Sequence, residues 1–327
     1  MMFGGSELLL DLGALPFHIG VMDTPSNGAL PDSLPFAVGI HPETGLLVQM
    51  PNRYVAECLE TAYHRGSIIG TPMAEDGFGR RYTEDFLDFI MHCLGKSNLN
   101  NSRLLEIGCG TGYLLHRFQR LGADVIGIEP GSEGQAGAKR YGVKILQDVF
   151  PGSNIAIESR YYDIIVHYAV LEHVADPLEF LKIQSHCLKD EGLIFVAVPN
   201  CQDYIDTGDI SMFVHEHWSY FTPSSLNALA SMAGLKLLRS EPSKYGNLVY
   251  AMLGRGEVAS RLSPTSFESL STFAGRVHRN IERAGQRLEK MAGNPLGIFV
   301  PARAINLLTV VQTSGLYRFF DDDPSAA

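Results

Sequence analysis

The sequence is poor in the features that mark secreted, metal-binding and membrane proteins. Its cysteines, Cys58, Cys93, Cys109, Cys187 and Cys201, include no C-x-x-C pair. Neither a zinc ribbon nor a redox dithiol is therefore encoded, and isolated thiols are typical of a reducing compartment. No apolar run reaches the roughly 20 residues of a membrane helix, and the N-terminus MMFGGSELLLDLG lacks a basic region and a cleavage pattern. We expect a cytoplasmic protein with no membrane partner.

Basic residues are also few. Lysine and arginine number 26 against 36 aspartates and glutamates, which gives a net charge of −10. This balance argues against nucleic acid as a partner, because a phosphate backbone attracts basic surfaces. The 327 residues, of which 45% are hydrophobic, are enough for one large or two ordinary domains with apolar cores.

What the sequence does contain is a strand, a glycine turn, a helix and a second strand in one stretch, RLLEIGCGTGYLLHRFQRLGADVIGIE. Residues 103–107 are a short apolar run, as expected of a parallel strand buried on both faces. Residues 112–121 carry apolar side chains on one helical stripe. Residues 124–128 form the second apolar run, which predicts a strand–turn–helix–strand unit.

The turn has the chemistry of a ligand site. Gly108, Gly110 and Gly112 alternate in it, and glycines allow positive φ angles and let a ligand approach without meeting a Cβ. In such units an acid about 20 residues after the first glycine accepts hydrogen bonds from ribose hydroxyls, and Glu129 is that acid. A nicotinamide or flavin site would have the spacing G-x-G-x-x-G for a pyrophosphate. Here the spacing is G-x-G-x-G, and the preceding Glu106 would repel a pyrophosphate and attract a cation.

The motif EIGCGTG resembles motif I of class I S-adenosylmethionine-dependent methyltransferases. A glycine turn in a ligand-free α/β protein is the alternative interpretation. The resemblance implies S-adenosylmethionine as cofactor, with Glu106 near its ammonium, Glu129 on its ribose and Asp148 on its adenine. The predicted cofactor-binding residues are Glu106, Gly108, Cys109, Gly110, Gly112, Glu129, Pro130, Asp148, Val149 and His167.

The remaining strands complete the expected fold. The segment YYDIIVHYAVLEHVADP is a second match to the same enzymes, with a strand at 163–166 and a helix that contains residues 171–174. The other predicted elements are helices at 131–142 and 177–188 and strands at 143–147, 192–198, 235–241 and 246–253. Together they predict an α/β fold with a seven-stranded, doubly wound, mostly parallel sheet that has an antiparallel edge. Small N-terminal and C-terminal extensions flank it.

The loop HEHWSYFTPSSL is the richest in reactive side chains. If the segment is extended, His215 and His217 share a face, but the further ligands of a metal site are missing, so we expect no metal. General acid or base work is favoured because histidine titrates near neutrality; histidines that only hydrogen-bond the loop are the alternative. The pattern resembles a subgroup of sugar C-methyltransferases, which implies that Glu216 and His217 lie beside the transferred methyl. Thr222 and Pro223 then predict the start of a helix.

The resemblance is weaker at the two ends of the chain. Residues 1–50 contain short strands, and their LDLGALP and TGLLVQM frames resemble the zinc module of the same subgroup. His41 and Thr44 replace the expected cysteines, so we predict no zinc and a surface-turn histidine. Residues 51–100 are expected to be helical, at 54–64 and 82–94. Residues 255–327 should hold a helix over 255–292 and then a strand, a helix and a strand, a partial α/β domain.

Four segments follow: an N-terminal module at 1–50, a substrate-side helical segment at 51–100, the cofactor-binding domain at 101–254 and the C-terminal segment at 255–327. The resemblance also places Tyr63 near the substrate, with Arg80 a second candidate in the loop 66–81; packing and a solvated charge are their alternatives.

The predicted reaction is methyl transfer to a small-molecule acceptor, with a nucleotide-linked keto-sugar favoured. His217, oriented by Glu216, would act as base, and His173 and Tyr63 would position the acceptor. The alternatives are an O-methyltransferase of another small metabolite and a cofactor-binding protein without turnover.

Overall fold

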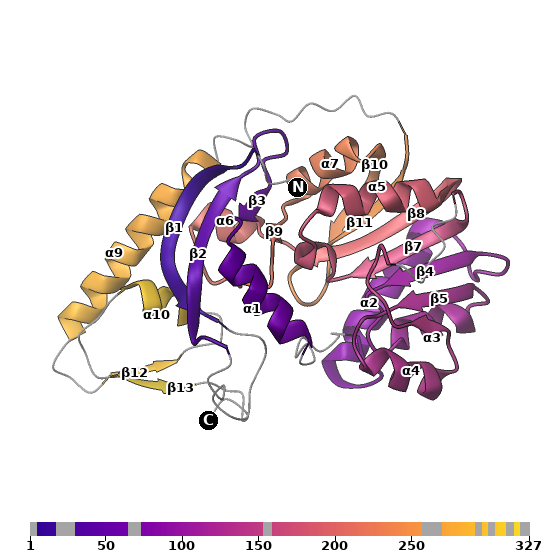
Figure 1. Ribbon diagram of the computed structural model, residues 1–327, viewed down its shortest axis with the longest axis horizontal. Coiled ribbons are helices and arrows are strands. Elements are labelled where there is room, and N and C mark those ends of the chain that lie inside the picture. The colour runs from indigo at the N-terminus through magenta and orange to yellow at the C-terminus, as the bar shows by residue number, and fades with distance from the viewer. Residues whose placement is uncertain are drawn as a thin grey trace. The chain divides into compact units, whose positions relative to one another are not determined.

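The computed structural model divides into two compact units (Figure 1). Unit 1 comprises Met1–Gly4, Gly70–Asn200 and Ser219–Leu262, and unit 2 comprises Gly5–Ile69, Cys201–Trp218 and Ser263–Ala327. The residues described are 5–17, 30–64, 73–152, 159–256, 270–291, 296–299, 305–311 and 317–320. The boundaries expected at residues 50, 100 and 254 stay predictions.

Unit 1 is built on a seven-stranded sheet with the order β10-β11-β8-β7-β4-β5-β6. Six of the seven strands run in one direction, and β11 is reversed because it pairs with both β8 and β10 in antiparallel fashion. The predicted α/β fold with a mostly parallel sheet is confirmed. The chain starts at β4, runs outward through β5 and β6 and returns to β7 on the other side of β4. Neighbouring strand ends that diverge in this way form the crevice in which such sheets bind ligands. The strands are β4 (Arg103–Ile107), β5 (Asp124–Ile128), β6 (Ile145–Leu146), β7 (Tyr162–Tyr168), β8 (Leu188–Pro199), β10 (Leu235–Pro242) and β11 (Leu248–Arg255).

Helices cover this sheet through their apolar sides. Phe86 and Phe89 of α2 pack on Tyr250 of β11, with ring centroids 4.8 and 5.4 Å apart, while Leu114 and Phe118 of α3 are fully buried. Figure 1 shows α3 and α4 beside β4 and β5. The helical elements are α2 (Gly77–Leu94), α3 (Tyr113–Arg120), α4 (Glu133–Tyr141), η1 (Leu171–His173), α5 (Pro177–Cys187) and α7 (Pro223–Met232), and the short strand β9 (Ser219–Tyr220) precedes α7.

The start of α7 follows the predicted capping chemistry. The Thr222 side chain accepts a hydrogen bond from the Ser225 backbone N–H, the Ser225 hydroxyl caps the Thr222 N–H in return, and Pro223 occupies the first turn. This reciprocal arrangement satisfies donors that a helix end leaves unpaired. The helix start predicted there is confirmed.

Two helix predictions need correction. The helix expected around residues 171–174 is the single 3₁₀ turn η1, because Val174 is already extended and α5 starts afresh with Asp176 as cap and Pro177 in its first turn. The helix expected at 82–94 begins earlier, at Gly77. Its first turn is mostly exposed, so apolar periodicity does not mark it.

Unit 2 holds an antiparallel sheet in which β1 pairs with β2 and β2 with β3. Asn306 of α10 donates a 2.7 Å hydrogen bond to Phe213 O, and the Phe213 ring contacts Phe36 and Phe273. The expected C-terminal strand, helix and strand are present, with β12 and β13 paired in parallel. Of the helix expected at 255–292, the structure shows α9; Arg255 instead ends strand β11, and residues 257–269 lie outside the described residues. The elements are β1 (Glu7–Pro16), β2 (Ser33–Ile40), β3 (Leu47–Gln49), α1 (Arg53–His64), α6 (Gln202–Thr207), α9 (Phe273–Met291), β12 (Leu296–Phe299), α10 (Ile305–Val311) and β13 (Tyr317–Phe320).

Among the helices that the structure describes, none combines the length and the apolar character needed to cross a bilayer.

Candidate functional site

The glycine turn of unit 1 joins β4 to α3 at the carboxyl edge of the sheet. Gly108, Gly110 and Gly112 have φ angles of +67°, +51° and +74°, a region that side chains with a Cβ rarely adopt. The Gly108 N–H donates a 2.8 Å hydrogen bond to Ile128 O, which ties the turn to the end of β5. A Cβ on Gly108 would also lie 2.5 Å from Val170 Cγ2. Each glycine is therefore required by backbone conformation.

Glu129 braces the turn from the next strand. Its Oε2 accepts the Gly110 N–H and its Oε1 the Gly131 N–H, both at 2.8 Å. Burial raises the pKa of this carboxyl, while the two backbone hydrogen bonds lower it. A carboxylate offers about four lone-pair sites, so Glu129 keeps accepting capacity for ribose hydroxyls.

Glu106 lies in β4 immediately below the turn. Its side chain is 3% exposed, and within the described residues its Oε2 has no hydrogen-bond partner. Burial, and then the nearby Glu129, raise the pKa of the Glu106 carboxyl well above its usual value. A buried charge without a partner is costly, and a ligand cation would remove that cost. The turn and Glu106 thus fit a ligand with a cationic group and do not suit a pyrophosphate.

Three further predicted cofactor residues lie at the ends of the adjoining strands. Asp148 follows β6, is half-buried, and accepts the Val149 N–H at 2.8 Å. Val149 is 57% exposed, and Pro130 after β5 is exposed as well. Because β5 and β6 are parallel to β4, the three residues share the edge of the sheet that carries the turn. Their contacts with a cofactor stay predictions.

His167, predicted to bind the cofactor, is fully buried in β7, in register with Ile107 of β4. Neither ring nitrogen has a hydrogen-bond partner in the described part of the chain, and the ring packs edge-on against Phe180 with centroids 5.5 Å apart. Burial lowers the pKa of His167 to about 3, so the imidazole is neutral at physiological pH. His173 in η1 is half-buried, with Nε2 4.0 Å from Glu172 Oε1.

The segment that contains the two histidines is a turn of unit 2 and not an extended segment. The His217 N–H donates to Val214 O at 3.1 Å and closes the turn. His215 is 1% exposed, its Nε2 lies 3.1 Å from Leu34 O, and its ring meets Phe17 edge-on. It is a core residue of unit 2, since a hydrogen-bonded imidazole can replace an apolar side chain there.

The other predicted catalytic residues are distributed over both units. Glu216 and His217 are each 7% exposed and belong to unit 2, as does Tyr63, whereas His173 belongs to unit 1. Tyr63 lies in α1, and its side chain lies outside the described residues. Arg80 is an exposed residue of α2. The catalytic roles of Glu216, His217, His173 and Tyr63 stay predictions, as does a place near the substrate for Arg80.

His41 was expected in a surface turn and is buried instead. It is 8% exposed, and its Nδ1 lies 3.1 Å from the Thr44 hydroxyl. Burial lowers the pKa of His41. The side chain of Thr44, which also accepts the Leu46 N–H at 3.2 Å, gives His41 a partner inside the turn that follows β2.

Two residues around the glycine turn were missed in the sequence. Val170 lies over Gly108, as described above, and Gly137 of α4 lies under the turn. A Cβ on Gly137 would stand 1.8 Å from Thr111 O, so the helix backbone is packed directly on the turn. A glycine inside a predicted helix is itself the signal of such a close approach.

Comparison with known proteins agrees with this geometry. A family model described as "Methyltransferase domain" matches residues 78–240. A Ubiquinone biosynthesis O-methyltransferase from Pseudoalteromonas translucida (strain TAC 125) is 29% identical over 177 residues, which is 50% of this chain and 74% of that protein. The protein of the same name from Rhodopseudomonas palustris (strain BisA53) is 38% identical over 107 residues, 32% of this chain and 42% of the relative. The chain spans less than two thirds of the length of most such relatives.

Solved structures with a related fold include 1,6-didemethyltoxoflavin-N1-methyltransferase from Burkholderia thailandensis. It is 16% identical, with a TM-score of 0.47 and coverage of 72% of this chain and 99% of that one. The S-adenosylmethionine-dependent methyltransferase from Clostridium acetobutylicum ATCC 824 is 12% identical, with a TM-score of 0.43 and coverage of 53% and 92%.

The strand order, the glycine turn with its two acids, and the match of residues 78–240 lead to one assignment. This chain carries a class I S-adenosylmethionine-dependent methyltransferase domain.

Proposed function

We propose that the protein transfers the methyl group of S-adenosylmethionine to a small-molecule acceptor. The observation that carries this proposal is the buried Glu106 carboxylate below the glycine turn, whose Oε2 lacks a hydrogen-bond partner in the described part of the chain. A cationic ligand satisfies that oxygen, and the match to a methyltransferase domain supports S-adenosylmethionine as this ligand.

In this proposal the acids of unit 1 hold the cofactor by its polar groups. When bound, S-adenosylmethionine supplies a methyl group already activated by its sulfonium. Glu106 attracts the ammonium group, Glu129 accepts hydrogen bonds from the ribose, and Asp148 accepts one from the adenine amino group. Alignment of donor and acceptor can lower the activation free energy by about 7 to 11 kcal/mol, so positioning is the larger part of the protein's task.

The acceptor proton is assigned to the imidazole of His217. Glu216 would orient the ring, His217 would remove the proton, and His173 and Tyr63 would position the acceptor. General base catalysis of this kind contributes about 10² to 10⁴ in rate.

The acceptor atom can be a hydroxyl oxygen or a carbon next to a ketone. The names of the relatives, Ubiquinone biosynthesis O-methyltransferases, favour a hydroxyl. The HEHWSYFTP segment and the N-terminal LDLGALP frame favour C-methylation of a nucleotide-linked keto-sugar, because they resemble sugar C-methyltransferases. In either reaction a base removes one proton from the acceptor. The same residues can therefore serve both reactions, which differ only in their product.

Calorimetric titration with S-adenosylhomocysteine tests the cofactor site, and incubation with methyl-labelled S-adenosylmethionine and a panel of phenols, catechols and nucleotide-linked keto-sugars tests the transfer. We expect saturable binding and a product heavier by one methylene, whose carbon NMR shift separates O-methylation from C-methylation. Folded protein that takes up no S-adenosylhomocysteine would refute the cofactor site. Binding without transfer to any member of the panel would favour a cofactor-binding protein without turnover.

A further inference from the structure

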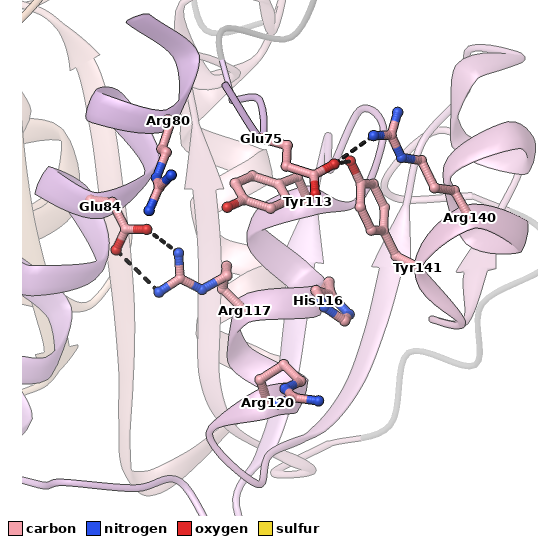
Figure 2. Close-up of a pocket in the computed structure, with 9 residues that line it drawn as sticks. All are labelled: Glu75, Arg80, Glu84, Tyr113, His116, Arg117, Arg120, Arg140 and Tyr141. Carbon is pink, nitrogen blue, oxygen red and sulfur yellow. Dashed lines mark hydrogen bonds and ion pairs between the residues drawn. The ribbon is translucent and has the colours of Figure 1, made fainter. Parts of the chain in front are cut away.

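Unit 1 contains a polar cavity whose lining residues do not include the glycine turn. Its volume is about 720 Å³, within the 300 to 1,000 Å³ range that is typical of small-molecule sites. Figure 2 shows it bounded by side chains of α2, α3 and α4. The lining residues are Glu75, Arg80, Glu84, Tyr113, His116, Arg117, Arg120, Arg140 and Tyr141. Four guanidinium groups face two carboxylates there, in a chain whose net charge is −10.

Both carboxylates that line the cavity, those of Glu75 and Glu84, form ion pairs with arginines. Glu84 forms a two-pronged pair with Arg117, and Glu75 pairs with Arg140 and accepts the Tyr141 hydroxyl at 3.4 Å. The bidentate pair with Glu84 holds the Arg117 guanidinium group in a fixed orientation. The dashed lines in Figure 2 mark these contacts on opposite sides of the cavity.

Two positive charges remain in excess. Within the described part of the chain, the side chains of Arg80 and Arg120 have no hydrogen-bond or ion-pair partner. Figure 2 shows Arg80 on α2 and Arg120 at the far end of α3. Unpaired guanidinium forks match the oxygens of phosphate groups in charge and in geometry.

Aromatic rings occupy the space between these arginines and Arg140. The Tyr141 ring lies 5.7 Å from Tyr113 and 5.4 Å from His116, the latter at an angle of 31°. The His116 Nδ1 atom is buried and has no hydrogen-bond partner among the described residues. A flat heterocycle with polar edges would find both a stacking surface and a hydrogen-bond partner here.

We propose that this cavity binds a nucleoside diphosphate, with Arg80 and Arg120 on the phosphates and the base against Tyr141 and His116. The volume of the site fits a small molecule, and the acidic chain as a whole does not attract nucleic acid. The site does not depend on methyl transfer, since none of its residues belongs to the glycine turn or to the proposed base.

The probe is uridine diphosphate, titrated by calorimetry into the full chain saturated with S-adenosylhomocysteine so that the cofactor site is closed to it. We expect saturable binding that weakens at least about tenfold in Arg80→Ala and in Arg120→Ala, because each loses a charge-assisted contact. Uridine, without phosphates, should bind at least about tenfold more weakly. Arg120→Lys should fall between wild type and Arg120→Ala, since it keeps the charge and loses the fork.

The matched control is Arg160→Ala, an exposed arginine of unit 1 outside the cavity; it should leave the affinity unchanged. An unchanged affinity for S-adenosylhomocysteine shows that each variant is folded. The proposal would be overturned if uridine diphosphate did not bind, if uridine bound as tightly as uridine diphosphate, or if Arg80→Ala and Arg120→Ala bound uridine diphosphate as tightly as wild type does. None of these results would bear on the proposed methyl transfer.

Discussion

At the scale of single residues, Glu106 is a buried carboxyl group whose Oε2 has no hydrogen-bond partner among the described residues. Glu106→Gln keeps the shape and removes the charge. We expect its affinity for S-adenosylmethionine to fall at least about tenfold, the loss of one charge-assisted hydrogen bond, as measured by calorimetry. Glu191→Gln, at an exposed position of unit 1, is the control. Wild-type affinity in Glu106→Gln would remove this residue from the cofactor site.

The raised pKa of Glu106 also fixes the direction of two pH effects. In the folded protein the group holds its proton to higher pH than in the unfolded chain, so its contribution to stability is present below the unfolded pKa and is lost as pH rises through the folded pKa. At neutral pH, Glu106→Gln should therefore raise the melting temperature of ligand-free protein. Cofactor affinity should rise with pH through the folded pKa in wild type, because the carboxylate binds the cation, and this rise should be absent in the variant.

His217→Ala tests the proposed base. We expect kcat to fall at least about 10²-fold while the affinity for S-adenosylhomocysteine stays the same, because the cofactor residues lie in unit 1. His92→Ala, an exposed histidine of α2, should change neither value. Unchanged kcat in His217→Ala would leave its imidazole with a structural role only, like the one that His215 has.

At the scale of elements, α4 and the glycine turn are fitted to each other through Gly137. Gly137→Ala places a Cβ where Thr111 O now stands, so helix and turn must separate. We expect a loss of stability of about 1 to 3 kcal/mol, as for other overpacked sites, together with weaker cofactor binding. Gln135→Ala, exposed on the same helix, should be neutral or slightly stabilising because alanine favours helix. Thermal unfolding with and without S-adenosylhomocysteine measures both effects.

The sequence predicted best the elements whose signal is local. The strands at 103–107 and 124–128 agree with β4 and β5, since a short apolar run between turn residues describes a buried strand completely. The region around residue 171 failed because a helical turn and a helix share the same pattern over three residues. The burial of His41 and His215 also escaped prediction, since each depends on partners supplied by tertiary packing.

The same contrast separates the two sites of unit 1. The glycine turn of the cofactor site and Glu129 lie within one continuous stretch, residues 103–129. Their spacing is therefore visible in the sequence. The arginine cavity draws Glu75 and Arg140 together from 65 positions apart and takes its other residues from α2, α3 and α4. No periodicity links such residues in the sequence, and only the packing of three helices reveals the cavity.

At the scale of the whole molecule, the residues proposed for catalysis and cofactor binding belong to two different units. The cofactor residues belong to Gly70–Asn200 of unit 1, while Glu216 and His217 belong to unit 2. Residues 201–218 leave unit 1 after β8 and return to it at β9, so unit 2 receives Glu216 and His217 from a segment embedded in the chain of unit 1. The proposed cofactor residues can therefore be followed in unit 1 and the proposed base in unit 2.

Hydrogen exchange can resolve this division. S-adenosylhomocysteine should slow exchange in the turn at 108–112 and at Gly131 by up to about 100-fold at a hundred times its Kd, because only openings that break the cofactor site lose the binding energy. Local openings in β1 and β2 of unit 2 should be unaffected. Equal protection of both units would mean that they open together, and the cofactor site could not then be assigned to unit 1 alone. His217→Ala should reproduce the wild-type pattern, because its side chain is proposed to meet the acceptor and not the cofactor.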